Sequence, residues 1–180
     1  MTRIIIYLAL LATTLFVGSC NNKPNLETYF VENQEKKGFV TFDVTPSILN
    51  INATKLSSDE KATLDSFEKM NILAFKVDDK NKVQFDLEKQ KIKSILKDTL
   101  KYHELIDFGS GSEAVKVSFV GTDDNIKEFV LYGNQENSGF GIVRILGNNM
   151  KAENAMDLIS ILKNSDIDTE QLKAIKNIIK

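Results

Sequence analysis

Three short apolar segments, separated by turn-forming residues, most constrain the fold of this chain. They are Val115–Val120, Ile126–Tyr132 and Phe140–Leu146, and the first alternates apolar and polar side chains as a half-buried strand does. The connections between them, Gly121–Asn125 and Gly133–Gly139, consist of glycine and polar residues. Connections this short join antiparallel neighbours, because parallel strands need a longer crossover. The pattern therefore predicts a C-terminal three-stranded antiparallel meander.

Helical patterns and two further strands accompany the meander. The predicted strands are Phe39–Val44 and Asn71–Val77. The predicted helices cover residues 26–31, 46–51, 57–70, 85–102, 152–162 and 169–179. Asn25 is a predicted helix N-cap, and Ser57 with Glu60 has the spacing of a capping box. The predicted buried stripe of the 85–102 helix is Ile92, Ile95, Leu96 and Leu100.

This order of elements predicts the fold class. Helices and strands alternate first, the meander follows, and helices close the chain. We therefore expect an α+β fold with a largely antiparallel sheet and helices packed on one of its faces. No internal repeat or inner linker interrupts residues 26–180, so this segment is predicted to be a single domain.

The first twenty residues have the pattern of an export signal. Arg3 precedes the apolar run Ile4–Val17, which is shorter than the ~20 residues that a helix needs to cross a bilayer. A basic residue, a short apolar run and then small residues are typical of a signal peptide. We therefore expect residues 1–19 to be removed during export.

The sequence Val17-Gly18-Ser19-Cys20 resembles the lipobox of bacterial lipoproteins, and Cys20 is the only cysteine. The resemblance implies that cleavage occurs just before Cys20, that its thiol receives a diacylglyceryl group, and that its new amino group is acylated. Residues 20–25 are then a short tether between lipid and domain. The alternative is a secreted protein with an unpaired thiol, which is unusual among exported proteins.

The lipobox resemblance also bears on location. In lipoproteins the residue after the cysteine influences sorting between membranes, and Asn21 is not the aspartate that favours inner-membrane retention. The tether also lacks the acidic cluster associated with surface display in Bacteroidetes-type bacteria. We expect a cell-envelope protein, anchored through lipid on Cys20 in the outer membrane and facing the periplasm. Its formal net charge of -2 gives no general attraction to nucleic acid, so no such partner is expected.

Candidate catalytic chemistry depends on His103, the only histidine. A Ser–His arrangement would have to use it, with Ser110 or Ser112 as nucleophile and Asp107 nearby in the sequence. The G-x-S-x-G motif is absent, and the Gly/Ser segment lacks the strand-to-helix context of a nucleophile elbow. One histidine and one lipid-bearing cysteine do not supply the ligands of a zinc site. We therefore predict no catalytic residue, no metal and no cofactor, and we expect the protein not to be an enzyme.

The second half of the chain carries a further resemblance. Tyr102–Ile106, Glu128–Leu131, and Ile145–Gly147 before Leu158 resemble a family of small Bacteroidetes-type lipoproteins, whose domain is known as the domain of unknown function 4252. The similarity extends from about Leu26 to Leu162. The family implies no activity and no catalytic residues.

Three functions follow from these observations as hypotheses. The favoured one is a non-enzymatic lipoprotein that binds another envelope protein or supports an envelope complex. The second is a carrier or sensor of a small apolar ligand, held in a pocket between sheet and helices. It is suggested by the phenylalanines, of which 11 are in the sequence and all but Phe16 are in the expected mature chain, which has few other aromatic residues. It would need an apolar cavity of at least ~300 Å³. The third is a hydrolase that uses a serine and His103.

Overall fold

The structure is a computed structural model that describes residues 23–45, 56–110 and 112–164. Its helices are α2 (Leu26–Asn33), α3 (Ser58–Ser66), α4 (Lys82–Leu96) and α5 (Asn154–Asn164). Its strands are β1 (Phe39–Val44), β2 (Phe67–Lys76), β3 (His103–Ser110), β4 (Glu113–Thr122), β5 (Asn125–Gln135) and β6 (Gly139–Met150). Residues 20–22 of the tether, which include Cys20, and the predicted helices at 46–51 and 169–179 lie outside the described residues.

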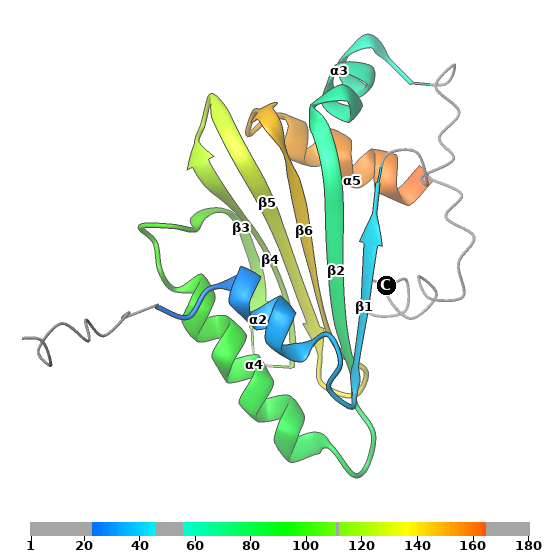
Figure 1. The fold of residues 1–180 in the computed structure, drawn as a ribbon, viewed down its shortest axis with the longest axis vertical. Coiled ribbons are helices and arrows are strands. Elements are labelled where there is room, and N and C mark those ends of the chain that lie inside the picture. Colours follow the sequence, from blue (N-terminus) through cyan, green and yellow to red (C-terminus); the bar gives the residue numbers. More distant parts are fainter. Residues whose placement is uncertain (1–22, 46–55, 111, 165–180) are drawn as a thin grey trace, which may run out of the picture.

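The six strands form one antiparallel sheet in the order β1-β2-β6-β5-β4-β3 (Figure 1). Strands β3 to β6 follow one another as a meander, β2 pairs with β6, and β1 pairs with β2. Gly139, at the start of β6, has a φ of +130°, and a Cβ there would lie 1.8 Å from the carbonyl oxygen of Phe75. Only glycine therefore allows this approach to β2. The predicted α+β class, antiparallel sheet and single domain are confirmed.

The meander has four strands, so the predicted three-stranded meander is one strand too short. The additional strand, β3, begins at His103, directly after the segment that was predicted as helix. Its register with β4 shifts between Glu104 and Ile106. Such an irregularity breaks the two-residue alternation by which a strand is recognised, because it turns the following side chains to the other face.

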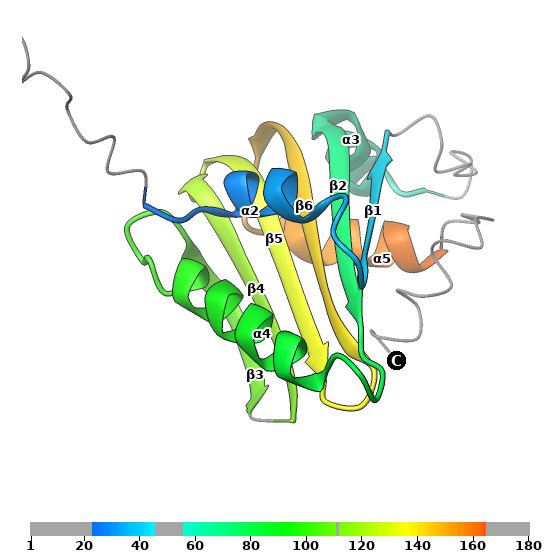
Figure 2. The ribbon, with the colours of Figure 1, turned by 60° about the horizontal axis from the view of Figure 1, so that its bottom comes forward.

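Helices cover both faces of the sheet, which corrects the prediction that they pack on one face (Figure 2). Helices α2 and α4 contribute Leu26, Phe30, Phe85 and Ile92 to a core cluster on one face. On the other face, Ala155 of α5 and Leu64 of α3 pack against a second cluster. The central strands explain this arrangement, because they are apolar on both sides: in β2, Ile72 and Ala74 belong to one cluster and Leu73 and Phe75 to the other.

Phenylalanines form much of the core beneath α4. The rings of Phe75 and Phe140 are stacked with centroids 5.5 Å apart, and Phe85 of α4 lies 6.1 Å from Phe140. Phe39 meets Phe75 edge to face at 4.9 Å. These distances are those of aromatic packing in protein interiors, so these phenylalanines serve to join the sheet to α4.

The two predicted helix caps are confirmed, whereas the helix predicted from residue 85 begins at Lys82 and two predicted helix ends are wrong. Asn25 accepts a hydrogen bond from the Thr28 amide (3.0 Å), and Ser57 and Glu60 form the complete capping box. Helix α3 ends at Ser66, where the buried strand β2 begins. Helix α4 ends at Leu96, so Leu100 lies in a turn with 86% of its surface exposed. The other predicted stripe residues, Ile92, Ile95 and Leu96, are buried.

Candidate functional site

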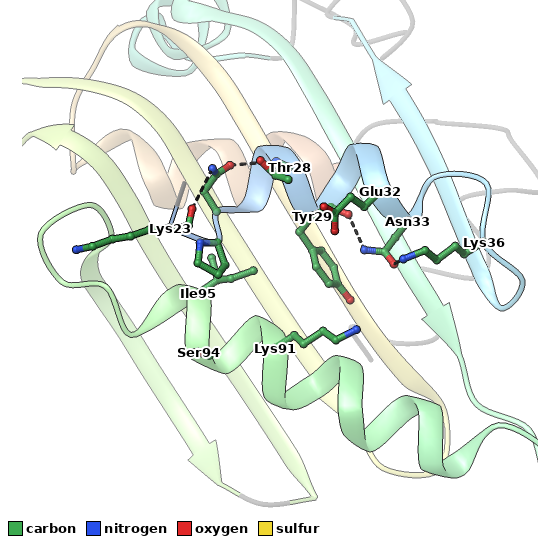
Figure 3. Close-up of a pocket in the computed structure, with 11 residues that line it drawn as sticks. Lys23, Thr28, Tyr29, Glu32, Asn33, Lys36, Lys91, Ser94 and Ile95 are labelled. Atoms are coloured by element: carbon green, nitrogen blue, oxygen red, sulfur yellow. Dashed lines mark hydrogen bonds between the residues drawn. The ribbon is translucent and has the colours of Figure 1, made fainter. Parts of the chain in front are cut away.

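An open groove of about 370 Å³ runs between α2 and α4 (Figure 3). Its walls come from α2 with the residues before it, and from one side of α4. Charged side chains in its lining are Lys23, Glu32, Lys36 and Lys91. The groove begins at Lys23, where the described chain enters the domain, so it lies beside the predicted tether. The groove is open rather than enclosed and carries these charged groups along it, whereas a carrier of apolar ligands needs an enclosed apolar cavity.

A hydrogen-bonded network holds α2 to α4 beneath this groove. The Tyr29 hydroxyl donates to Glu88 Oε2 (2.8 Å), and Lys91 Nζ donates to Glu88 Oε1 (2.9 Å). Burial, reinforced by the bond to Glu88, holds the pKa of Tyr29 far above its ordinary value. Both oxygens of the buried carboxylate therefore have partners, and the tyrosine stays protonated at neutral pH. This arrangement is suited to holding α2 and α4 together rather than to transferring a proton.

Asn33, also buried, extends the network along the groove. Its Nδ2 donates to the Tyr29 carbonyl (2.6 Å), and its Oδ1 accepts from Lys36 Nζ (3.0 Å). Two of the groove lysines, Lys36 and Lys91, therefore already have intramolecular partners. Their ammonium groups are held in place on the groove wall (Figure 3).

A buried ion pair lies on the same face of the sheet. Arg144 of β6 donates to Glu128 of β5 through Nε (2.7 Å) and Nη2 (3.1 Å), in a bidentate geometry. The Phe30 ring of α2 covers the guanidinium at 5.4 Å. Ser118 lies in the same cross-strand row as Arg144, and its buried Oγ has no hydrogen-bond partner in the described part of the protein. Because the Phe30 ring of α2 lies over this ion pair, we infer that the pair helps to hold α2 against the sheet.

The edge of the sheet carries exposed apolar side chains, which we call the β3–β4 strip: Ile106, Phe108 and Val115. Phe108 and Val115 are directly opposite each other in the β3–β4 pairing. The exposed fractions are 76% for Phe108, 48% for Val115 and 38% for Ile106. Strand β3 is the last strand on this side of the described sheet, so one row of its backbone groups has no strand partner among the described residues. The strip was not predicted, because it depends on recognising β3 and its register.

The residues of the hydrolase hypothesis do not form a catalytic arrangement. His103 is at the start of β3, with its ring 5.0 Å from that of Phe119, whereas Ser110 ends the same strand. Seven residues of extended chain separate them by roughly 23 Å. Ser112 follows in the β3–β4 connection, and Asp107 is paired with Lys116 (3.1 Å). The structure therefore does not bring His103 together with these serines or with this aspartate.

Two further observations concern metals and membranes. Within residues 23–45, 56–110 and 112–164, no three His, Cys, Asp or Glu side chains are grouped so that they could hold a metal ion. None of the helices in these ranges has the length and apolar character required to span a bilayer. Cys20, the predicted lipid-attachment residue, precedes them.

Fold and surfaces define the class of protein: an α+β domain built on a six-stranded antiparallel sheet, with a groove beside its N-terminus and an apolar strip at one sheet edge. The chain belongs to the family described as Domain of unknown function (DUF4252), whose model matches residues 29–158. The predicted resemblance to the domain of unknown function 4252 is thereby confirmed. No match was found among curated proteins or among solved structures.

Proposed function

We propose that this protein is a lipid-anchored, non-enzymatic module of the cell envelope that binds another envelope protein. Cys20 is the proposed site of lipid attachment, and the proposed location is the periplasmic face of the outer membrane. The observation that carries the binding role is the exposed β3–β4 strip at a sheet edge that no other described strand covers. Exposed apolar side chains grouped on one surface are typical of interaction sites.

The chemistry of the edge favours one kind of partner. On the face opposite the strip, Glu104 and Asp107 share one cation, Lys116, which leaves an excess of negative charge. An extended segment can add to a sheet edge through backbone hydrogen bonds, while its side chains alternate between the two faces. We therefore propose an extended segment with alternating apolar and basic side chains as the occupant of the β3 edge.

The alternative functions draw less support from the described residues. Four of the phenylalanines that suggested a carrier, Phe39, Phe75, Phe85 and Phe140, pack against one another, and the groove between α2 and α4 is open rather than enclosed. The hydrolase hypothesis needs a base beside a nucleophile, and His103 lies at the opposite end of β3 from Ser110.

The anchor is tested by Cys20→Ser. We expect this variant to lose lipidation, because the hydroxyl does not replace the thiol as lipid acceptor, and to remain unprocessed or soluble after export. Detergent-phase partitioning of cell extracts, with the mass of the mature protein, measures this. A serine variant that has lost residues 1–19 and still enters the detergent phase would contradict the anchor.

The binding role is tested by a photoreactive phenylalanine analogue in place of Phe108 in the full chain, expressed in its own host. We expect one defined cross-linked product that disappears when Val115→Lys is added, and Val115→Lys alone to reproduce the phenotype of the deletion strain. The same analogue at Val83, an apolar α4 residue that is 77% exposed, is the matched control. A cross-link to a second copy or to residues 165–180 would identify another occupant and overturn the proposal, as would the absence of a product.

A further inference from the structure

The turn between α4 and β3 presents one apolar side chain between lysines. Leu100 is more exposed than any other large apolar side chain in the described part of the protein, at 86%. Lys97 and Lys101 flank it, and Lys93 is exposed on the last turn of α4. An exposed leucine surrounded by lysines is the pattern of segments that lie at a membrane surface.

Hydrogen bonds hold this turn in a fixed shape. The amides of Lys101 and Tyr102 donate to the Asp98 carbonyl at 3.0 and 2.8 Å. The Leu100 amide donates to Asp98 Oδ1 at 3.2 Å. The one acidic side chain of the turn is therefore directed to the backbone, and Leu100 is held at the outside of the turn.

The same turn is attached to the point where the tether enters the domain. The buried Tyr102 hydroxyl accepts a hydrogen bond from the Leu26 amide (3.1 Å), at the start of α2. In both Figure 1 and Figure 2, the first described residues leave the domain beside the connection from α4 to β3. Lys23 is three positions after Cys20, and this stretch of chain reaches at most ~11 Å when extended. A lipid on Cys20 therefore keeps this corner of the domain at the bilayer.

We propose that the turn Lys97–Lys101 is a second membrane contact, in which Leu100 enters the headgroup region and Lys93, Lys97 and Lys101 lie against lipid phosphates. This inference rests on the proposed anchor at Cys20. The charge distribution supports a lipid surface as the occupant: the chain has a net charge of -2, yet three lysines and only Asp98 occupy the segment from Lys93 to Lys101. Lysines close to an anionic membrane surface are attracted to it, and salt screens that attraction.

The test uses the full chain, processed and acylated in its host, in vesicles of phosphatidylethanolamine and phosphatidylglycerol. In Leu100→Cys the new thiol is the reactive one, because the Cys20 thiol carries lipid, and it is labelled with a polarity-sensitive fluorophore. We expect blue-shifted emission and strong quenching by lipids that carry a quencher near the headgroup. Val83→Cys is the matched control, since Val83 is 77% exposed but lies at the other end of α4, ~20 Å away.

Two further measurements test the lysine contribution to the membrane contact and the acylation of Cys20 separately. The double variant Lys97→Gln with Lys101→Gln should lower the equilibrium constant for insertion of the turn into the headgroup region by about 5-fold per lysine. Vesicles of phosphatidylcholine, which has no net charge, should lower the same constant to a similar extent. The mass of the purified protein reports acylation of Cys20 independently of the fluorescence. An acylated protein whose Leu100 label is unquenched, or no more quenched than the Val83 label, overturns the second contact and leaves the anchor intact. An unacylated Cys20 overturns the proposed function, and with it this inference.

Discussion

At the scale of single residues, Phe119 and Phe108 show how position decides the role of a side chain. Phe119 is 5% exposed and packs in the core cluster with Phe129 and Ile145. Phe108, on the neighbouring strand, is largely exposed in the β3–β4 strip. The first therefore contributes buried apolar area to stability, whereas the second leaves its ring available to another molecule.

Phe119→Ala should lower the free energy of unfolding by about 3–5 kcal/mol, because it removes a buried ring and leaves a cavity. Phe108→Ala, the matched control, should change it by no more than about 0.5 kcal/mol, as surface substitutions do. Urea denaturation followed by circular dichroism measures both. Equal losses would show that the strip is covered in solution, and an unchanged Phe119→Ala variant would contradict the register of β4.

At the scale of elements, the sequence alone predicts a feature correctly where residues close together in the chain determine it. The cap at Asn25 and the capping box of Ser57 and Glu60 were predicted, because each is made within one turn of helix. The face of β4 that carries Val117 and Phe119 was also predicted from alternation, and both side chains are buried.

Elements whose limits depend on distant residues were not predicted. Helix α4 continues to Leu96 only, because the next residues form a turn and Tyr102 packs against the start of α2. The irregular register between Glu104 and Ile106 concealed β3. The consecutive apolar residues Ile72–Phe75 signal a strand buried on both faces, and this signal could have indicated helices on both sides of the sheet.

The candidate surfaces depend on the same distant contacts. The groove exists only because α2 and α4 dock side by side, through Tyr29 and Glu88, which are 59 residues apart in the sequence. The β3–β4 strip exists only because β3 is the last strand of the sheet. Cys20, in contrast, was singled out by a short sequence motif and lies outside the described residues.

At the scale of the whole molecule, the two proposed surfaces have separate positions along β3. The turn with Leu100 precedes the start of β3 at His103, whereas Phe108 lies five residues further along the strand. That spacing corresponds to roughly 17 Å. If the turn lies on the bilayer, the strip is directed away from the lipid contact, where a partner can reach it. Anchor and binding edge can therefore act at the same time.

The stability of the whole molecule should decrease at alkaline pH because of three buried tyrosines in the described residues, Tyr29, Tyr102 and Tyr132. Burial is the main cause that raises the pKa of each phenol above its ordinary value, and Glu88 adds to this effect at Tyr29. In the unfolded chain these groups ionise near pH ~10. Above that pH the unfolded chain has lost protons that the folded chain retains, so the free energy of unfolding falls as pH rises. Below pH ~10 the phenols are protonated in both states and give no such dependence.

We therefore expect tyrosinate absorbance to rise together with the loss of the circular dichroism signal, as one cooperative transition above pH ~10. Tyr132→Phe is the informative variant, because it removes one phenol that must ionise and leaves the ring. Its stability should fall less steeply with pH above ~10 than that of the parent chain, even though the hydrogen bond from the Tyr132 hydroxyl to Asn134 Oδ1 (3.2 Å) is lost. Tyrosines that ionise near their ordinary pKa while the circular dichroism signal persists would contradict the burial of these rings, and with it the packing of α2 on the sheet.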